Sequence, residues 1–132
     1  MDDLTRFVDT QTVVTAVEPD PQDPNHVSLQ ANLERLQGMR TEDGSPLRVI
    51  ELPMREPARL QGERMPASYA NFYFGNRTVL MPAYGQPRDA VAQIILQQCF
   101  PDRRVLALDS SDLIWGLGSF HCLTVQEPLG SL

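Results

Sequence analysis

The spacing of apolar residues changes several times along the chain between the period of a strand and that of a helix. This predicts short strands and two helices. Runs rich in branched and aromatic residues are typical of strands, and five stretches have this composition. They cover residues 6–18, as a strand or hairpin, and residues 47–52, 69–75, 78–84 and 104–108. Gly75 and Asn76 are expected to join the third and fourth runs as a hairpin.

Two further segments carry apolar residues at helical spacing. Ser28 is expected to cap the first helix, whose apolar face consists of Leu29, Leu33, Leu36 and Met39. Pro87 is expected to open the second helix, with Asp89 in its first turn, where the helix dipole favours an anion. The predicted buried face of that helix consists of Val91, Ile94, Ile95 and Cys99. The proline-rich segments 18–25 and 54–67 are predicted to be loops, with His26 and the second loop exposed.

The predicted order is strand, helix, strand in the first half and two strands, helix, strand in the second, which is approximately one unit of strand, strand, helix and strand written twice. Similarity between the residues of the two halves is low, so the repeat rests on element order and spacing. The fold class is therefore α/β. A twofold unit of this kind leaves sheet edges open, and we expect it to be part of a larger radial assembly.

The composition fits one globular domain of 132 residues, 42% of them hydrophobic and 21% charged. A net charge of −6 argues against binding to nucleic acid or to an anionic membrane and favours a cationic ligand. The sequence shows no secretion signal and no membrane-spanning run. Cys99 lies in a predicted helix and Cys122 follows a glycine loop, so the two do not form a disulfide framework. We therefore expect reduced thiols in the cytoplasm. Two distant histidines give little support for a metal site.

Residues 115–126 contain the strongest candidate for a catalytic residue. Gly116 and Gly118 precede an adjacent His121–Cys122 pair, and a β-prone run follows. Glycine lets a backbone approach a ligand closely, and a cysteine after such a loop is placed as a thiolate nucleophile. Neighbouring side chains of an extended segment point to opposite faces, so His121 is expected to be structural. The competing interpretation of Cys122 is a small buried hydrophobe.

Five blocks of the second half resemble, in order, the agmatine deiminase family of guanidine-modifying hydrolases, which is related to bacterial peptidylarginine deiminase. That family has the motifs Tyr-x-Asn-Phe, Pro-aromatic-Gly, Asp-x-x-Ala, Phe-Pro-x-Arg and a glycine run before His-Cys-Ile-Thr. The matching blocks are residues 68–73, 79–85, Asp89 with Ala92, 100–103 and 118–124. Residues 2–8 resemble the family segment that follows a His-x-Asp motif, so the resemblance covers essentially the whole chain.

The resemblance implies a pentein fold, a five-bladed α/β propeller that holds its substrate at the central axis. This chain is expected to supply roughly the last two blades, as a partial pentein with mixed strands and two helices. Residues 1–67 would form one blade unit with its loop, and residues 68–132 the final blade with the catalytic cysteine.

The resemblance also implies residue roles. Cys122 matches the nucleophile that attacks the guanidinium carbon of agmatine, and Asp2 matches a carboxylate that binds the guanidinium group. Gly116 and Gly118 are expected to belong to the substrate-binding loop. Water would then release N-carbamoylputrescine, after the loss of ammonia, without a cofactor, as a step of polyamine synthesis.

Two departures from the family pattern bear on activity. The general acid and base histidine would lie two residues before Asp2, ahead of the first residue of this chain, so the isolated chain is expected to have little or no activity. Leu117 and Ser119 interrupt the family's glycine run, and a leucine at that position is expected to narrow the pocket.

Two other interpretations stay open at this point. The chain is alternatively a non-catalytic fragment that pairs with another chain, or with itself as a homo-oligomer, through exposed blade edges. In the second alternative the enzyme acts on peptidyl-arginine or another guanidine in place of agmatine.

Overall fold

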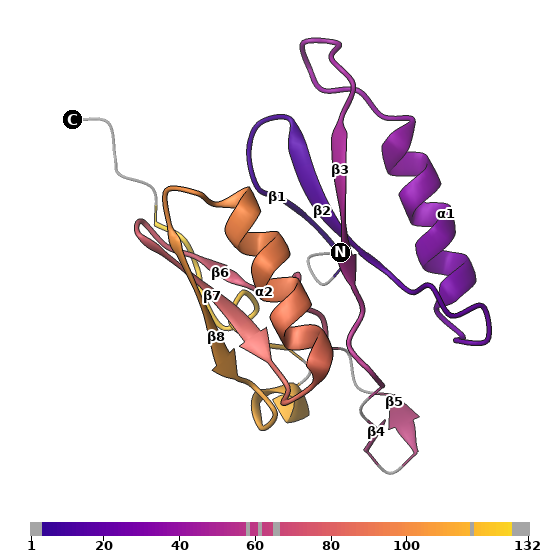
Figure 1. The fold of residues 1–132 in the computed structure, drawn as a ribbon, viewed down its shortest axis with the longest axis vertical. Helices are drawn as coiled ribbons and strands as arrows, with labels where there is room; N and C mark the ends of the chain where they lie inside the picture. Colours follow the sequence, from indigo (N-terminus) through magenta and orange to yellow (C-terminus); the bar gives the residue numbers. More distant parts are fainter. Residues whose placement is uncertain (1–3, 58, 61, 65–66, 117, 128–132) are drawn as a thin grey trace.

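Two units with the same element order make up the fold (Figure 1). The computed structural model describes residues 4–57, 59–60, 62–64, 67–116 and 118–127. The first unit consists of β1 (Thr5–Phe7), β2 (Thr12–Val17), α1 (His26–Gln37) and β3 (Arg48–Pro53). The second consists of β6 (Tyr73–Phe74), β7 (Thr78–Ala83), α2 (Pro87–Cys99) and β8 (Arg104–Asp109). A hairpin of β4 (Arg59–Leu60) and β5 (Glu63–Arg64) lies between them in sequence, and the 3-10 helix η1 (Leu113–Gly116) follows β8.

Both units have the same mixed sheet topology. β1 pairs antiparallel with β2, and β2 pairs parallel with β3, from Thr12 opposite Arg48 to Val17 opposite Pro53. β6 pairs antiparallel with β7, and β7 pairs parallel with β8, from Thr78 opposite Arg104 to Ala83 opposite Asp109. A parallel pair needs a crossover connection, and a helix supplies it in each unit. The predicted α/β class and the repeat of strand, strand, helix and strand are thus present in the structure.

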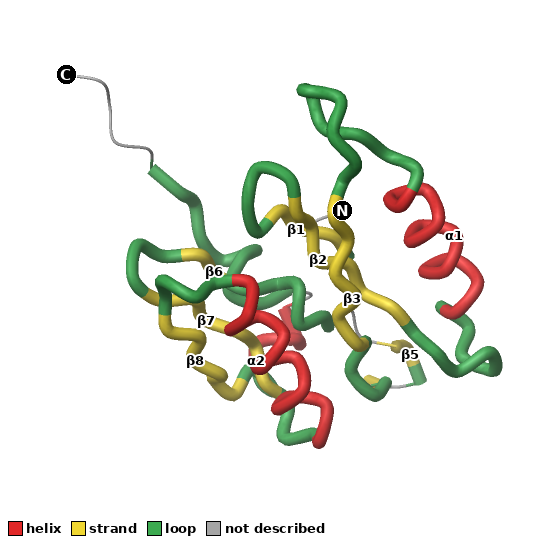
Figure 2. The backbone as a smooth tube through the Cα atoms, turned by 45° about the horizontal axis from the view of Figure 1, so that its top comes forward, coloured by secondary structure: helices red, strands yellow, loops and turns green. Residues whose placement is uncertain are grey.

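The second helix packs against both units. α1 contacts β2 and β3 of its own unit, whereas α2 contacts β8 of its own unit and β3 of the first unit. Figure 2 shows α2 beside its own sheet, with β3 of the first unit next to it. The first unit therefore forms part of the packing surface on which the second unit rests.

One hydrophobic core joins the two units. Its largest fully buried side chains are Tyr69, Phe72, Phe100, Leu52 and Met81, of which only Leu52 comes from the first unit. Val8, Val14 and Leu52 of the first unit belong to the same cluster. A smaller cluster of Ala16, Leu29 and Met54 lies under α1.

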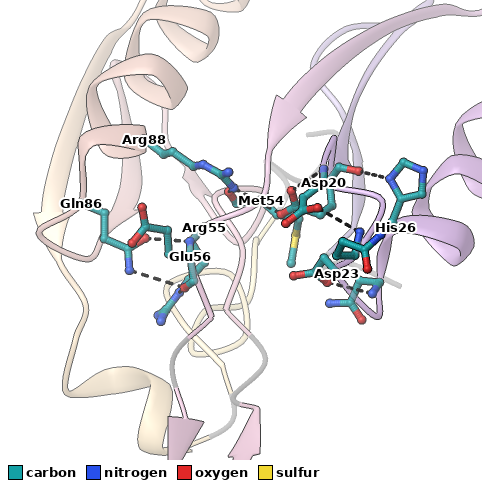
Figure 3. A network of polar contacts seen from close by, with 11 residues as sticks. Asp20, Asp23, His26, Met54, Arg55, Glu56, Gln86 and Arg88 are labelled. Atoms are coloured by element: carbon teal, nitrogen blue, oxygen red, sulfur yellow. Dashed lines mark hydrogen bonds and ion pairs between the residues drawn. The ribbon is translucent and has the colours of Figure 1, made fainter.

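Polar contacts also connect the units (Figure 3). Arg88 of α2 donates to the carbonyl oxygen of Met54 at 2.7 Å and forms an ion pair with Glu18 at 3.3 Å. The backbone N–H of Glu56 donates to the side-chain oxygen of Gln86 at 2.9 Å. The Arg88 contacts satisfy part-buried polar groups at the point where the chain leaves the first unit, and the Glu56–Gln86 bond is exposed.

The first helix differs from its prediction at both ends. α1 begins at His26 with Asn25 as its N-cap residue, so Ser28 lies inside the first turn, where its hydroxyl donates to the Asn25 carbonyl at 3.0 Å. His26 is half-buried, not exposed, because its Nδ1 lies 2.6 Å from the Glu18 carbonyl oxygen that it bonds. Met39 follows the end of α1 and is exposed.

The predicted buried face of the second helix is wrong for two of its four residues. Val91 and Ile94 are 50% and 60% exposed, whereas Ala92 and Leu96 are buried. Ile95 and Cys99 do pack against the core. Residues four positions apart share one helix face, and the contacts with β8 and β3 select the face of Ala92 and Leu96. Val91 and Ile94 then point outward.

The loop predicted at 54–67 and the strand predicted after it both differ. The segment 54–67 contains the β4–β5 hairpin, Met54 is buried with Ala16 and Leu29, and Arg55 is buried with its guanidinium group over the Tyr84 ring at 4.5 Å. Residues 69–72 are a buried turn and loop, and the following strand begins only at Tyr73. Their backbone carbonyls at Ala70 and Phe72 accept hydrogen bonds from Arg6.

None of the helices that the structure describes is long and apolar enough to cross a membrane.

Candidate active site

Cys122 lies in a tight turn that follows η1, within the yellow C-terminal segment of Figure 1. The N–H of Leu123 donates to the Ser119 carbonyl at 3.1 Å, and the N–H of Thr124 donates to the His121 carbonyl at 3.2 Å. The Thr124 hydroxyl donates to the Phe120 carbonyl at 2.8 Å. The predicted extended, β-prone run is therefore wrong at this point, because the backbone bonds of the segment close on themselves.

Gly118 is in direct contact with the cysteine. A Cβ atom placed on Gly118 would stand 2.7 Å from the Cβ of Cys122 and 3.1 Å from its Sγ, closer than real Cβ atoms pack. The missing side chain of Gly118 thus makes room for Cys122 itself. Gly116 is different, because a Cβ atom there would meet no other atom within 4 Å.

The side chain of Asn71 holds the same turn from the other side. Its Oδ1 accepts the backbone N–H of His121 at 2.9 Å and that of Cys122 at 3.3 Å. Its Nδ2 donates to the Sγ of Cys122 at 3.0 Å. The sequence analysis did not name Asn71 as a site residue, and its contact with the sulfur was missed. The signal that pointed to it was its place in the Tyr-x-Asn-Phe block.

Arg6 fixes the segment that carries Asn71. Its guanidinium group donates to the carbonyls of Ala70 at 3.2 Å and Phe72 at 2.9 Å, and it lies 4.5 Å from the centre of the Phe72 ring. Arg6 belongs to β1 of the first unit, so a strand near the N-terminus positions a loop more than sixty residues away in sequence.

An open hollow lies next to the turn. It measures about 440 Å³. Its lining consists of Thr5, Arg6, Phe7, Phe74, His121 and Gln126. The structure thus brings together the N-terminal strand, β6 and the cysteine turn, with His121 facing the hollow beside Cys122.

The two thiols have different surroundings. Both are reduced, but Cys122 is exposed, whereas Cys99 packs against the core. Burial raises the pKa of the Cys99 thiol. The interpretation of Cys122 as a buried hydrophobe is therefore wrong, and Cys122 is the thiol that solvent and small molecules can reach.

Some sequence-based candidates are not placed. Asp2 and Leu117 lie outside the described residues, so their predicted roles stay predictions. Ser119, also in the interrupted glycine run, is buried, and its hydroxyl has no hydrogen-bond partner within the part of the chain that the structure describes. Within that part, no group of three or more His, Cys, Asp and Glu side chains is arranged to hold a metal ion.

The chain is similar to known proteins over nearly its whole length. The Porphyromonas-type peptidyl-arginine deiminase family matches residues 1–128. A Legionella pneumophila protein assigned to the agmatine deiminases is 33% identical over 129 residues, which are 97% of this chain and 37% of that protein. An arginine deiminase-type structure from Porphyromonas gingivalis is 43% identical with a TM-score of 0.93, covering 96% of this chain and 38% of that one. The agmatine deiminase of Enterococcus faecalis is 27% identical with a TM-score of 0.91, covering 96% of this chain and 40% of its own.

The chain thus spans about two fifths of the length of these relatives. The match is continuous through both units and includes the turn that carries Cys122. It confirms the resemblance that the sequence motifs indicate. The chain belongs to the Porphyromonas-type peptidyl-arginine deiminase family.

Proposed function

We propose that this chain carries the cysteine half of an agmatine deiminase active site, in a hydrolase that converts agmatine to N-carbamoylputrescine and ammonia. The observation that carries the proposal is the exposed thiol of Cys122, set between the bare Cα of Gly118 and the amide of Asn71. A thiol held this way is placed to act as a nucleophile.

The reaction proceeds in two steps at Cys122. The thiolate sulfur bonds to the guanidinium carbon, the bond from that carbon to a terminal nitrogen breaks, and the nitrogen takes a proton and leaves as ammonia. Water then adds to the carbon of the thiouronium intermediate. The carbon–sulfur bond breaks with its electron pair returning to sulfur, and the oxygen of water becomes the carbonyl oxygen of N-carbamoylputrescine. No cofactor takes part.

The other half of the site comes from elsewhere in the protein. The chain supplies roughly two blades of a pentein, residues 1–67 and 68–132, and the remaining blades complete the propeller. Asp2 binds the guanidinium group, and the histidine of the His-x-Asp motif acts as general acid and base. Without that histidine we expect a rate lower by about two to four orders of magnitude.

The two glycines have separate parts in this proposal. Gly116 faces open space, which leaves room for a substrate to approach the turn. Gly118 lets the turn close on the cysteine. Leu117, which lies outside the described residues, is expected to narrow the pocket, and this departure from the family pattern is the reason to test other guanidines beside agmatine. With both thiols reduced, the protein works in the cytoplasm.

A chimeric enzyme tests this function. The matching part of the Enterococcus faecalis agmatine deiminase is replaced by this chain, and N-carbamoylputrescine formed from agmatine is measured. We expect product from the chimera and none from its Cys122→Ser variant. Labelling of Cys122 by a haloacetamidine, a guanidinium mimic, gives a second readout. A correctly folded chimera that makes no product and leaves Cys122 unlabelled would contradict the proposal.

Two alternative functions remain. The first is measured in the same assay with a second substrate. Product from an arginyl peptide but not from agmatine would make the protein a peptidyl-arginine deiminase, as the description of the matching family suggests. The other alternative, a non-catalytic fragment that associates with a partner or with itself, is favoured by the exposed Val91 and Ile94 on α2 and Leu108 on β8.

A further inference from the structure

We propose that Gln93 and Gln97 of α2 close the open edge of β8 against pairing with a second copy of this chain. The edge strand of a sheet presents a row of backbone N–H and C=O groups, and such a row is a template for another strand. Among the described strands, β8 pairs only with β7, so its far side is such an edge. The proposal is independent of the chemistry at Cys122.

Alternate residues of β8 turn their backbone groups toward β7. The N–H of Arg104 donates to the Arg77 carbonyl at 3.0 Å, and the N–H of Ser110 donates to the Ala83 carbonyl at 2.9 Å. The even-numbered residues therefore face β7, and the odd-numbered ones turn their backbone groups to the open edge. The outward residues of the strand are Val105, Ala107 and Asp109.

The side chain of Gln97 bonds this edge as a neighbouring strand would. Its Nε2 donates to the Arg103 carbonyl at 2.8 Å, and its Oε1 accepts the N–H of Val105 at 3.0 Å. A residue of a parallel strand makes the same pair of bonds, to one carbonyl and to the N–H two residues further along. The same Nε2 also donates to the Phe100 carbonyl at 3.0 Å, in the turn that leads into β8. Gln97 thus takes the place of one residue of an added strand.

Gln93 extends this cover along the edge. Its Nε2 donates to the Val105 carbonyl at 3.1 Å, so both outward groups of Val105 are bonded to α2. Residues four positions apart lie on the same face of a helix, which brings the two glutamines to one edge. Ala107 is the next outward residue, and within the part of the chain that the structure describes no side chain bonds its backbone.

A second copy of β8 fits the edge once the glutamines are gone. In an antiparallel pair centred on Ala107, each Ala107 bonds the other, and Val105 of one copy bonds Asp109 of its neighbour. Leu106 of one copy then lies opposite Leu108 of the other, and apolar cross-strand pairs stabilise such sheets. Leu108 is 41% exposed and free to make this contact. With Val105 occupied by α2, only the central Ala107 pair is left, and one pair of residues does not hold two strands together.

Hydrogen exchange on the wild-type chain tests the cover directly. The N–H groups of Val105 and Ala107 both face the open edge, but only that of Val105 has a bond, from Gln97. We expect the Val105 amide to exchange about tenfold more slowly than the Ala107 amide, measured by NMR at a protein concentration at which the chain is monomeric. Equal rates at the two positions would overturn the proposal.

A double variant tests the consequence. Gln93→Met with Gln97→Met removes the bonds to the edge but keeps side chains of similar size and helix propensity. We expect it to associate at about a tenfold lower concentration than the wild type in sedimentation velocity, and the Ala107 amide to become protected on association. Gln98→Met, at an exposed position of the same helix, is the matched control. Association no stronger than in this control would overturn the proposal.

A third substitution separates edge pairing from association through another surface. Ala107→Pro removes an N–H that faces away from β7, and proline is compatible with an edge strand at such a position. Added to the double variant, it should restore the monomer. Association that persists would show a different interface and would also overturn the proposal. Urea denaturation of each variant confirms that the protein compared is folded, and the exchange measurement on the wild type needs no variant.

Discussion

Gly118 and Cys122 occupy one small space, and the cysteine takes the volume that a side chain at Gly118 would need. A Cβ atom on Gly118 would stand 2.7 Å from the Cβ of Cys122. The Cβ of Cys122 is bonded directly to the backbone, so it cannot move away without a shift of the turn. The position of the thiol is therefore set by a residue that has no side chain.

Gly118→Ala is expected to displace the turn. Overpacking a close contact costs about 1–3 kcal/mol, and we expect a loss of this size in the free energy of unfolding, measured by urea denaturation. Alkylation of Cys122 should change as well, because the bond from Asn71 is disturbed. Gly116→Ala is the matched control, since its Cβ meets no atom within 4 Å. Equal effects of the two substitutions would contradict the role given to Gly118.

The two cysteines are expected to react at different rates. Burial raises the pKa of Cys99, and its thiol packs against the core, so less of it is thiolate and less is reachable. In the native chain at pH 8, iodoacetamide should modify Cys122 first, and Cys122→Ser should remove the fast phase. Cys99→Ala is the complementary variant and should leave the fast phase unchanged. Faster modification of Cys99 would show that the turn shields Cys122 in solution.

Tyr69 is expected to make stability depend on alkaline pH. Burial, and then the bond from its hydroxyl to Asp89 at 2.7 Å, raise the pKa of Tyr69 well above its ordinary value of about 10. A raised folded-state pKa contributes stability that is complete below the unfolded pKa and is lost as the pH rises past it. The stability advantage of the wild type over Tyr69→Phe should therefore be constant from pH 7 to about 9.

Above about pH 10 that advantage should shrink, because the unfolded chain ionises Tyr69 and the folded chain does not. The measurement is urea denaturation of both proteins at pH 7, 9 and 11. At neutral pH the substitution should cost about 1–2 kcal/mol, since it removes a hydrogen bond to a carboxylate. Tyr73→Phe, in β6, is the control. A pH-independent difference for Tyr69→Phe would rule out the linkage.

Arg88 is expected to contribute to stability at the junction of the two units. Arg88→Met leaves the Met54 carbonyl and the Glu18 carboxylate, which is only 3% exposed, without their shared donor. The side chain of Arg88 is 33% exposed, so we expect a loss of about 2 kcal/mol, below the cost of breaking a fully buried pair. Arg77→Met, at an exposed position, should change the free energy of unfolding by less than about 0.5 kcal/mol. Similar values for both variants would contradict this account.

The outward face of α2 is expected to drive association of the isolated chain. Val91 and Ile94 lie on this face, 50% and 60% exposed, and exposed apolar patches bind partners or copies of the same chain. Replacing both with glutamine should reduce the average mass in light scattering at high protein concentration. Val27→Gln, at an exposed position on α1, tests whether the effect is specific to α2. A monomer at all concentrations in the wild type would exclude this surface as an interface.

Hydrophobic period predicted the strands well where burial is continuous or alternates, as in β2 and β7, and it also predicted β8, of which only Val105 is buried. It failed on α2, which carries two apolar stripes. The stripe with Val91 and Ile94 is the more hydrophobic in sequence, yet contacts from β3 and β8 select the stripe with Ala92 and Leu96. The spacing of apolar residues in α2 carries no information on where β3 of the first unit lies.

The candidate site was predicted in part. Cys122 and its glycines were identified from local composition and from the family motif. The bonds of Asn71 to the same turn join residues about fifty positions apart, and nothing in the local sequence of either partner encodes the distance between them. The turn at residues 120–123 was missed because leucine, threonine and valine favour strands, while the hydrogen bonds within the segment favour a turn.

Arg6 connects the first unit to the loop that holds the cysteine turn, and this has a consequence for folding order. β1 helps to fix the loop around Asn71, and that loop helps to fix the cysteine turn. Such distant contacts form late, because long loops must close first. The geometry of the thiol therefore depends on contacts from the first unit. A misfolded chain that lacks them would still expose the cysteine, but without the turn and the Asn71 contact that hold its sulfur in place.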